Sequence, residues 1–517
     1  MSSVSDVSGA RRHQVLSGLL ALAVLCAAWL ALAQRASAAR DLDVGFADYL
    51  YGSINEQERD LWLDRTVDAN ADIVRVNLYW SSVATSKPSA PRDPSDPAYN
   101  FQMIDNAVRG AEARGLDVEL TVLSAPPWAE GGGRPRKAEP GTWKPDPRAY
   151  GDFAHAVAVR YSGAFPAASP APLPVVEYYQ AWNETNLDTY LAPQWKGKRN
   201  RSADIYVPLL NEFHDEVKAV NPEAEVVAAG TAPYGDPPGG PRRTQPLRFF
   251  QEMLCLDRRN RRGKCPKGGK PKADIFAHHP INREDPPREK ADFKGDVEIA
   301  DVHLLAEAVR KAEKLNTIAT PGKHPLWADE VWWQTDPPDR KEGITLEKHA
   351  RWTAEGLYLL WKQGVSKVIF LQFRDAEYRR GEHALASYQT GVYTYGGEKK
   401  PSYDAVRFPF VTEREGSGNK LRAWGVAPES GELIIEAKRG RGGYQQVGAK
   451  RVSEGKVFTD RLRAPGGRLK LRATVGGERS SVWVQGKAGK RNRKAGRRGA
   501  RHERHRGHHG HEGHRSR

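Results

Sequence analysis

Residues 178–186, YYQAWNETN, place two polar side chains at the end of an apolar run. The run begins at Val175 and has the length and composition of a buried strand. An amide, Asn183, and a carboxylate, Glu184, follow it side by side. What this pair does depends on where the strand lies in the fold and on whether a second carboxylate lies opposite it.

Eight such runs alternate with helix-like segments between about residues 42 and 410, in a chain of 517 residues. This alternation predicts an α/β fold, the (β/α)8 or TIM barrel. A doubly wound open sheet is the alternative, but no Gly-rich phosphate loop follows the first run. The eight runs are DVGFADY, ADIVRVNLYW, LDVELTVLSAPPW, VVEYYQAWNE, AEVVAAGTAP, ADIFAHHP, HPLWADEVWW and SKVIFLQFRD.

The unusual polar and aromatic residues of this region fall near the C-terminal ends of their runs. In a (β/α)8 barrel that end carries the catalytic site. A Trp at such a position is either a buried core residue or a platform on which a sugar ring stacks. The residues that share this placement are Trp80, Trp128, Asn183, Glu184, His279, Glu330 and Gln372.

Hydrolysis of a glycosidic bond requires two carboxyl groups, and two strand ends supply them. Glu184 is the candidate acid, and Asn183 beside it is placed to hydrogen-bond a sugar 2-hydroxyl. Glu330, at the end of the seventh run, is the candidate second carboxylate because it leads into Trp332. Since side chains alternate along a strand, its neighbour Asp329 is expected to point away from the barrel axis.

The sequence resembles the clan A glycoside hydrolases, the barrel group that includes families 5 and 39. WNETN resembles the acid/base motif of the fourth strand, and WADEVWW the nucleophile strand. The resemblance covers about residues 42–410 and implies a retaining double displacement, with Glu330 as nucleophile and Glu184 as acid and then base. It also implies that no metal or organic cofactor is needed.

Weaker matches to the clan extend the predicted substrate site. Arg75 resembles the second-strand Arg that supports the nucleophile, and AHHP resembles the sixth-strand His motif, with His279 the better aligned. Two positions depart from the pattern: Ile281 stands where an aromatic residue is usual, and Gln372 where Trp is usual. The predicted substrate-binding residues are Asn183, Arg75, Trp80, Trp128, His279, Trp332 and Gln372.

The rest of the chain divides into three further parts. Residues 1–38 carry a charged start, an apolar run and an A-x-A site, which predicts a signal peptide or, since the run is long, an uncleaved anchor. Residues 39–410 are then the catalytic domain. Residues 411–486 contain short alternating runs with Gly-containing turns, which predict a small antiparallel β-sandwich.

Residues 487–517 form a basic, His-rich tail with almost no apolar residues, which predicts disorder. The tail holds 12 Lys or Arg and 2 Glu, and so contributes +10 of the chain's net charge of +16. The body therefore has no nucleic-acid footprint. The tail is expected to contact anionic cell-envelope polymers, with metal binding by its histidines as the alternative.

Cysteine usage agrees with export from the cell. Removal of the signal peptide leaves Cys255 and Cys265, which flank the basic stretch LDRRNRRGK and are expected to form one local disulfide. We therefore predict a secreted or envelope-associated retaining glycosidase that acts on a carbohydrate. A non-catalytic polysaccharide-binding barrel and an envelope-attached interaction protein are the alternatives. The sugar, the linkage and the oligomeric state are not indicated.

Overall fold

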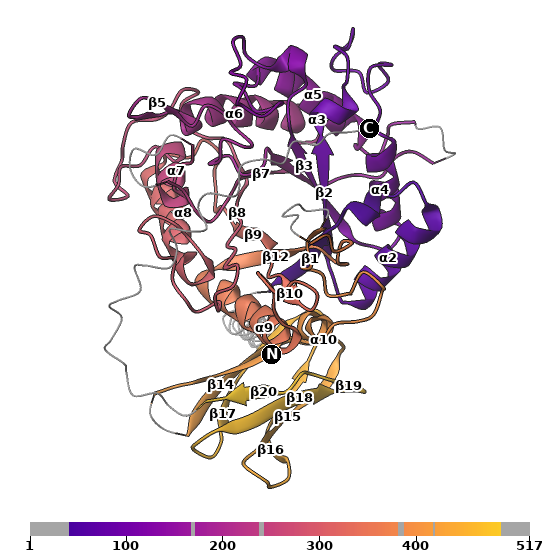
Figure 1. The fold of residues 1–517 in the computed structure, drawn as a ribbon, viewed down its shortest axis with the longest axis vertical. Helices are drawn as coiled ribbons and strands as arrows, with labels where there is room; N and C mark the ends of the chain where they lie inside the picture. The colour runs from indigo at the N-terminus through magenta and orange to yellow at the C-terminus, as the bar shows by residue number, and fades with distance from the viewer. Residues whose placement is uncertain (1–40, 167–170, 237–241, 381–386, 417–418, 487–517) are drawn as a thin grey trace, which may run out of the picture. The chain divides into compact units, whose positions relative to one another are not determined.

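Eight parallel strands close into a barrel in the order β1-β12-β9-β8-β7-β4-β3-β2 (Figure 1). The structure is a computed structural model that describes residues 41–166, 171–236, 242–380, 387–416 and 419–486. The last barrel strand pairs with the first, from Asp43 with Lys367 to Ala47 with Leu371, so the sheet is closed. The predicted (β/α)8 barrel is confirmed, and the open-sheet alternative is excluded. The strands are β1 (Asp43–Ala47), β2 (Ile73–Tyr79), β3 (Asp117–Leu123), β4 (Tyr178–Ala181), β7 (Glu225–Thr231), β8 (Ile275–His278), β9 (Leu326–Val331) and β12 (Val365–Leu371).

Helices connect successive strands and surround the barrel (Figure 1). In α9, Thr345 caps the first turn by accepting from the Lys348 N–H, and Gly364 ends the helix at a φ of 109°. None of the helices in the described ranges is both long and apolar enough to span a membrane. The helices are α2 (Glu56–Asp68), α3 (Trp80–Val83), α4 (Gln102–Glu112), α5 (Pro147–Arg160), α6 (Ser202–Val220), α7 (Pro246–Met253), α8 (His303–Leu315), α9 (Leu346–Gln363) and α10 (Pro401–Arg407), with 3-10 turns η1 (Tyr49–Gly52), η2 (Pro127–Ala129) and η3 (Ile299–Asp301).

Short two-residue strands lie in the loops between the barrel elements. Strand β5 (Trp195–Lys196) pairs with β6 (Arg199–Asn200) in the connection that follows β4. Strand β10 (Thr335–Asp336) pairs with β11 (Ile344–Thr345) in the connection that follows β9. Both pairs therefore belong to loops at the C-terminal end of the barrel, which is the end where the predicted site residues lie.

The barrel region contains both apolar clusters and a group of buried polar side chains. The apolar clusters are Ala47, Ile73, Ile369 and Leu371, and Val227, Ile275, Ala277 and Trp327. The polar group comes from β2, β3, β4 and β9 and consists of the buried residues Arg75, Glu119, Thr121, Gln180 and Asp329. Burying so many polar groups is unfavourable unless they satisfy one another, which suggests that this group is retained for a reason other than packing.

Antiparallel strands follow the barrel, as predicted for the C-terminal part. Strands β13 (Phe410–Arg414), β14 (Lys420–Val426) and β17 (Val457–Arg463) form one sheet. The predicted alternation of buried residues is confirmed in β18 (Leu469–Val475), where Leu469, Leu471, Ala473 and Val475 are all buried. The first of these strands, β13, begins at Phe410. The domain boundary at residue 411 stays a prediction. The other sheet consists of β15 (Gly431–Lys438), β16 (Gln445–Val452), β18 (Leu469–Val475), β19 (Glu478–Arg479) and β20 (Trp483–Gln485).

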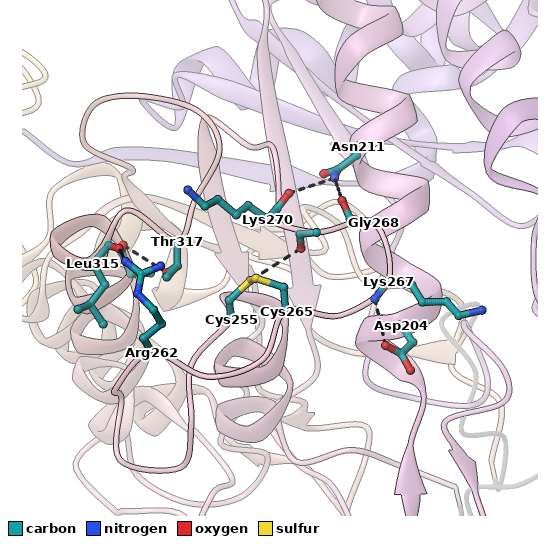
Figure 2. Close-up of a disulfide and its surroundings, with 12 residues drawn as sticks. Asp204, Asn211, Cys255, Arg262, Cys265, Lys267, Gly268, Lys270, Leu315 and Thr317 are labelled. Carbon is teal, nitrogen blue, oxygen red and sulfur yellow. Dashed lines mark hydrogen bonds between the residues drawn. A yellow bond between two sulfur atoms is a disulfide. The ribbon is translucent and has the colours of Figure 1, made fainter.

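The predicted disulfide is present between Cys255 and Cys265, in the connection from α7 to β8 (Figure 2). It closes a loop between residues 10 apart in sequence. The predicted signal peptide, residues 1–38, and the predicted tail, residues 487–517, lie outside the described residues. Their proposed roles stay predictions.

Candidate active site

Arg75 is the centre of the buried polar group inside the barrel. Alternation along β2 turns Arg75 into the barrel, where it is 2% exposed. Its guanidinium donates to Asn183 Oδ1 at 2.7 Å and to Glu330 Oε2 at 3.2 Å. Strands β2, β4 and β9 are not neighbours in the sheet, so these contacts cross the interior. Arg75 therefore ties together the two strand ends that the sequence singled out.

Backbone geometry fixes Glu184 at the mouth of the barrel. The residue has a φ of 38°, in the left-handed region that is unfavourable for a side chain with a Cβ. Its N–H donates to the Gly230 carbonyl oxygen at 2.8 Å, which holds this conformation against β7. Gly230 itself has a φ of 50°, and a Cβ there would lie 2.1 Å from Gln180 Nε2. Strain of this kind is typical of functional sites.

The two candidate catalytic carboxylates converge at this mouth. One oxygen of Glu184 and one of Glu330 lie within 4.8 Å of each other and of a His279 ring nitrogen. The side chains of Glu184 and Glu330 keep 13% and 15% of their surface exposed, so solvent reaches both. Glu330 also accepts a hydrogen bond from Trp332 Nε1 at 3.3 Å.

Asp329 does not point away from the barrel axis, contrary to the sequence prediction. It is completely buried, and its Oδ2 accepts a hydrogen bond from Gln180 Nε2 at 2.8 Å inside the barrel. The reason is a β-bulge: Val368 pairs with Ala328 and Phe370 with Val331, so β9 has one more residue than β12 here. A bulge breaks the alternation and places consecutive side chains on the same face.

His279 links the three carboxylates and carries a positive charge. Its Nδ1 lies 3.1 Å from Glu184 Oε1 and 3.7 Å from Glu330 Oε2, and its Nε2 lies 3.6 Å from Asp329 Oδ2. Burial alone would lower the pKa of His279, but the Glu330 and Asp329 charges raise it to about 10. His279 is therefore an imidazolium that donates toward Glu184.

His278, the adjacent histidine, is neutral instead of positively charged. Its Nε2 donates to the Val297 carbonyl oxygen at 2.9 Å, and its Nδ1 lies 2.8 Å from Thr231 Oγ1. Burial lowers its pKa to about 4, so the ring is neutral. Of the two histidines in the AHHP motif, His279 contacts the carboxylates and His278 does not. His279 is also the histidine that the sequence analysis preferred.

Opposing forces act on the pKa of Glu184. Burial raises the pKa, the hydrogen bond and charge of His279 lower it, and the charge of Glu330 raises it, so that the net effect is upward. Asp329 behaves differently, because the His279 and Arg75 charges overcome its burial and lower its pKa. A proton on Glu184 leaves Asp329 and Glu330 balanced by Arg75 and His279.

Glu184, His279 and Glu330 are the only group of potential metal ligands found within the described ranges. A metal ion there would have to displace the His279 proton and lie near the Arg75 guanidinium, which is 3.2 Å from Glu330. Ligands must be deprotonated to bind a metal, and an imidazolium with a pKa of about 10 resists this. The chemistry of the donor set therefore favours proton transfer over metal binding.

Trp80 is a packing residue, which corrects its prediction as a substrate platform. It is completely buried, and its ring stacks on Phe153 of α5 with centroids 5.4 Å apart. Trp80 lies beyond the end of β2, as the first residue of α3, and its ring packs against Tyr150 and Phe153 of α5. Trp128 lies against Trp80 edge to face at 5.4 Å and is only partly buried.

The remaining predicted residues lie at the mouth with different exposures. Trp332 is partly exposed and packs against Tyr388, with ring centroids 5.3 Å apart. Gln372 follows β12 and is 1% exposed, and its N–H donates to Thr390 Oγ1 at 2.9 Å. Ile281, in the position usual for an aromatic residue, is 6% exposed. The side chains that donate hydrogen bonds to Glu330 within the described part of the chain are Arg75 and Trp332.

Four tyrosines near the carboxylates escaped the sequence analysis. Burial and the charges of Glu184 and Glu330 raise the pKa of Tyr190, and the electrostatic effects of Tyr79 and Tyr388 act in the same direction. Tyr234 on the β7 loop lies within range of the Glu184 charge. Tyr79 could have been predicted from the sequence, because it lies four residues after Arg75 on β2 and therefore on the same face of the strand. The other three lie on loops, whose approach to the site only the fold determines.

Comparison with known proteins supports the fold. No protein-family model and no curated protein matches the chain. Among solved structures, the chain is similar to a family 39 glycoside hydrolase from the gut symbiont Bacteroides cellulosilyticus WH2, with 15% identity over 82% of this chain and 81% of that chain and a TM-score of 0.50. This similarity supports the barrel fold.

Weaker structural similarities were also found. A GH5_18 protein from Streptomyces cattleya, solved in complex with GlcNAc, is 16% identical over 71% of this chain and 79% of that chain, with a TM-score of 0.42. Xylanase 10B from Thermotoga petrophila RKU-1 is 14% identical over 71% of this chain and 93% of that chain, with a TM-score of 0.44.

Proposed function

We propose that the protein is a retaining glycoside hydrolase in which Glu330 is the nucleophile and Glu184 is the acid and then the base. The observation that carries the proposal is the separation of their carboxylate oxygens, within 4.8 Å at the C-terminal mouth of the barrel. Retaining enzymes hold their two carboxyl groups about 5–5.5 Å apart, whereas inverting enzymes need about 6.5–9.5 Å for a water molecule.

In the first step, Glu330 attacks the anomeric carbon while Glu184 gives its proton to the departing oxygen. Arg75 and Trp332 hold the Glu330 carboxylate in place through hydrogen bonds at 3.2 and 3.3 Å. Because Oδ1 of Asn183 accepts from Arg75, its amide nitrogen is the group that faces the sugar 2-hydroxyl. That contact strengthens as positive charge develops on the sugar ring.

In the second step, Glu184 takes a proton from water, which attacks the glycosyl-enzyme. Formation of the ester removes the Glu330 charge, which had raised the pKa of Glu184. The hydrogen bond from the His279 imidazolium then favours the Glu184 carboxylate, the form that acts as a base. His279 therefore assists the second step more than the first.

The test uses an activated aryl glycoside panel and two variants of the catalytic pair. Glu330→Gln is expected to abolish turnover, and Glu184→Ala is expected to recover activity with azide and yield a glycosyl azide of retained configuration. Glu347→Gln, at an exposed position on α9, is the matched control and should behave as the parent. Proton NMR of the first-formed sugar reports the stereochemistry, and an inverted product would refute the assignment.

We also propose that the protein is exported and acts outside the cell. The signal-like segment at residues 1–38 and the Cys255–Cys265 disulfide support this location, because disulfides persist in oxidising compartments. Sequencing the N-terminus of the protein recovered from its producing cells tests the proposal. Cleavage after Ala38 gives a chain that begins at Ala39, and recovery of the protein in the cytoplasm would contradict it.

A further inference from the structure

The disulfide closes part of a strongly basic loop whose charge the catalytic site does not use. We define the basic loop as residues 255–272, between α7 and β8. From Asp257 to Lys272 it contains eight Lys or Arg and one acidic residue, a net charge of +7. This is the densest positive charge in the sequence outside the tail.

Contacts to two helices hold the backbone of the basic loop (Figure 2). Asn211 of α6 donates from Nδ2 to the carbonyl oxygens of Gly268 and Lys270, both at 3.0 Å. The Lys267 N–H donates to Asp204 Oδ1 at 3.1 Å, and Arg262 donates to the Leu315 carbonyl oxygen at the end of α8. The loop is therefore fixed in shape, although its side chains are exposed.

Most of the cations on this loop have no carboxylate partner. Arg261 pairs with Asp257, and Lys272 pairs with Asp215. Within the described ranges, the other six cations form no ion pair. Arg262 donates to a backbone carbonyl oxygen, and the remaining five are exposed: Arg258, Arg259, Lys264, Lys267 and Lys270. Burial and the charge of nearby Arg248 lower the pKa of Arg258, and the charge of Glu252 only partly opposes them.

The arrangement of these cations suits a long, hydrated anion. Figure 2 shows the side chains of Lys267 and Lys270 extending in opposite directions, so they do not converge on one small ion. The loop has no aromatic side chain on which a nucleic-acid base could stack, and its one large apolar residue, Leu256, is 4% exposed. Insertion into a membrane needs an apolar face, which the loop lacks.

We propose that the basic loop is a binding surface for a carboxylate-bearing polysaccharide, separate from the catalytic mouth. Because the loop precedes β8, it lies at the N-terminal end of the barrel, whereas Glu184 and Glu330 lie at the C-terminal end. A polymer bound to the loop leaves the mouth free. The surface anchors the enzyme to an acidic matrix while its catalytic site faces outward.

The test compares two full-length variants of equal charge for binding to immobilised polygalacturonate. The loop variant replaces Arg258, Arg259, Lys264, Lys267 and Lys270 with Gln and keeps Arg262, which holds the loop against α8. The matched control replaces five exposed cations of the C-terminal sheets with Gln: Arg441, Arg451, Arg463, Arg468 and Lys470. Both retain the basic tail, so a difference in affinity reports the loop alone. Far-UV circular dichroism and the unfolding midpoint check that each variant is folded.

We expect the loop variant to bind about fivefold or more weakly than the control, because each exposed ion contact strengthens binding by about 1.4-fold to fivefold. The difference should shrink as salt is added. A third variant, Cys255→Ser with Cys265→Ser, keeps every cation and should bind more weakly than the parent because the loop is less ordered. Equal loss in the loop and control variants, or no binding by the parent, would overturn the proposal, as would tighter binding to DNA beads than to polygalacturonate.

Discussion

Replacing Glu119 by Gln should make the stability of the protein less sensitive to a rise in pH between about 4.5 and 8. Glu119 lies on β3, is completely buried, and has no hydrogen-bond partner for either carboxylate oxygen within the described residues. Burial and the charge of Asp329 raise the pKa of Glu119, and the charge of Arg75 only partly opposes them, so the pKa reaches about 8. The folded protein therefore holds Glu119 protonated at a pH where the unfolded chain ionises it.

The sign and size of the effect follow from linkage. Below pH 4.5, the usual pKa of the group, both states are protonated and its contribution to stability is complete. As the pH rises toward 8, unfolding releases a proton, and the free energy of unfolding falls by about 1.4 kcal/mol per pH unit. The full loss is about 4–5 kcal/mol at most.

Denaturant unfolding at several pH values between 5 and 8 measures this loss. Gln resembles the protonated acid in shape but does not ionise, so Glu119→Gln should unfold at a midpoint that changes less with pH. Glu347→Gln, at an exposed position, is the control and should follow the parent. The effects of other titrating groups cancel because all three proteins share them. Equal pH dependence in Glu119→Gln and the parent would refute the buried neutral acid.

Three further changes separate the roles of residues around the mouth. Asp329→Asn removes an anion near His279, so the pKa of His279 should fall from about 10, by about 1–3 units as judged by NMR titration, while the Glu347→Gln control is unchanged. Trp80→Ala should destabilise the fold by about 3–5 kcal/mol in denaturant unfolding, because the ring is buried against Phe153. Trp332→Phe keeps an aromatic ring but removes the indole N–H that donates to Glu330. We therefore expect kcat to fall about tenfold, with little change in the unfolding midpoint.

The barrel was predictable because its signal is repeated eight times along the chain. Each apolar run followed by a helical segment adds independent support for the same topology, and errors at single boundaries do not matter. The strand-end position of Glu184 followed in the same way, since the C-terminal ends of parallel strands meet at one mouth. Its left-handed backbone did not follow, because Gly230 imposes it from a different strand.

The two errors at the mouth have different physical origins. Trp80 is the first residue of α3, so its direction depends on where β2 ends, and element boundaries are difficult to predict from sequence. Asp329 required knowledge of the pairing between β9 and β12, because a bulge is defined by the partner strand. No pattern in the sequence of β9 alone distinguishes Asp329 as an inward residue.

Charge balance explains why the barrel tolerates so polar an interior. Four carboxyl groups, Glu119, Glu184, Asp329 and Glu330, share the space with the cations Arg75 and His279, and the charge of buried Lys367 also acts on Glu119. All four cannot ionise there without an uncompensated charge, which a low-dielectric interior strongly disfavours. Burial raises the pKa of Glu119 and of Glu184, so these two carboxyls hold a proton more readily than they would in water. Of these two, Glu184 alone lies at the mouth, where solvent reaches it.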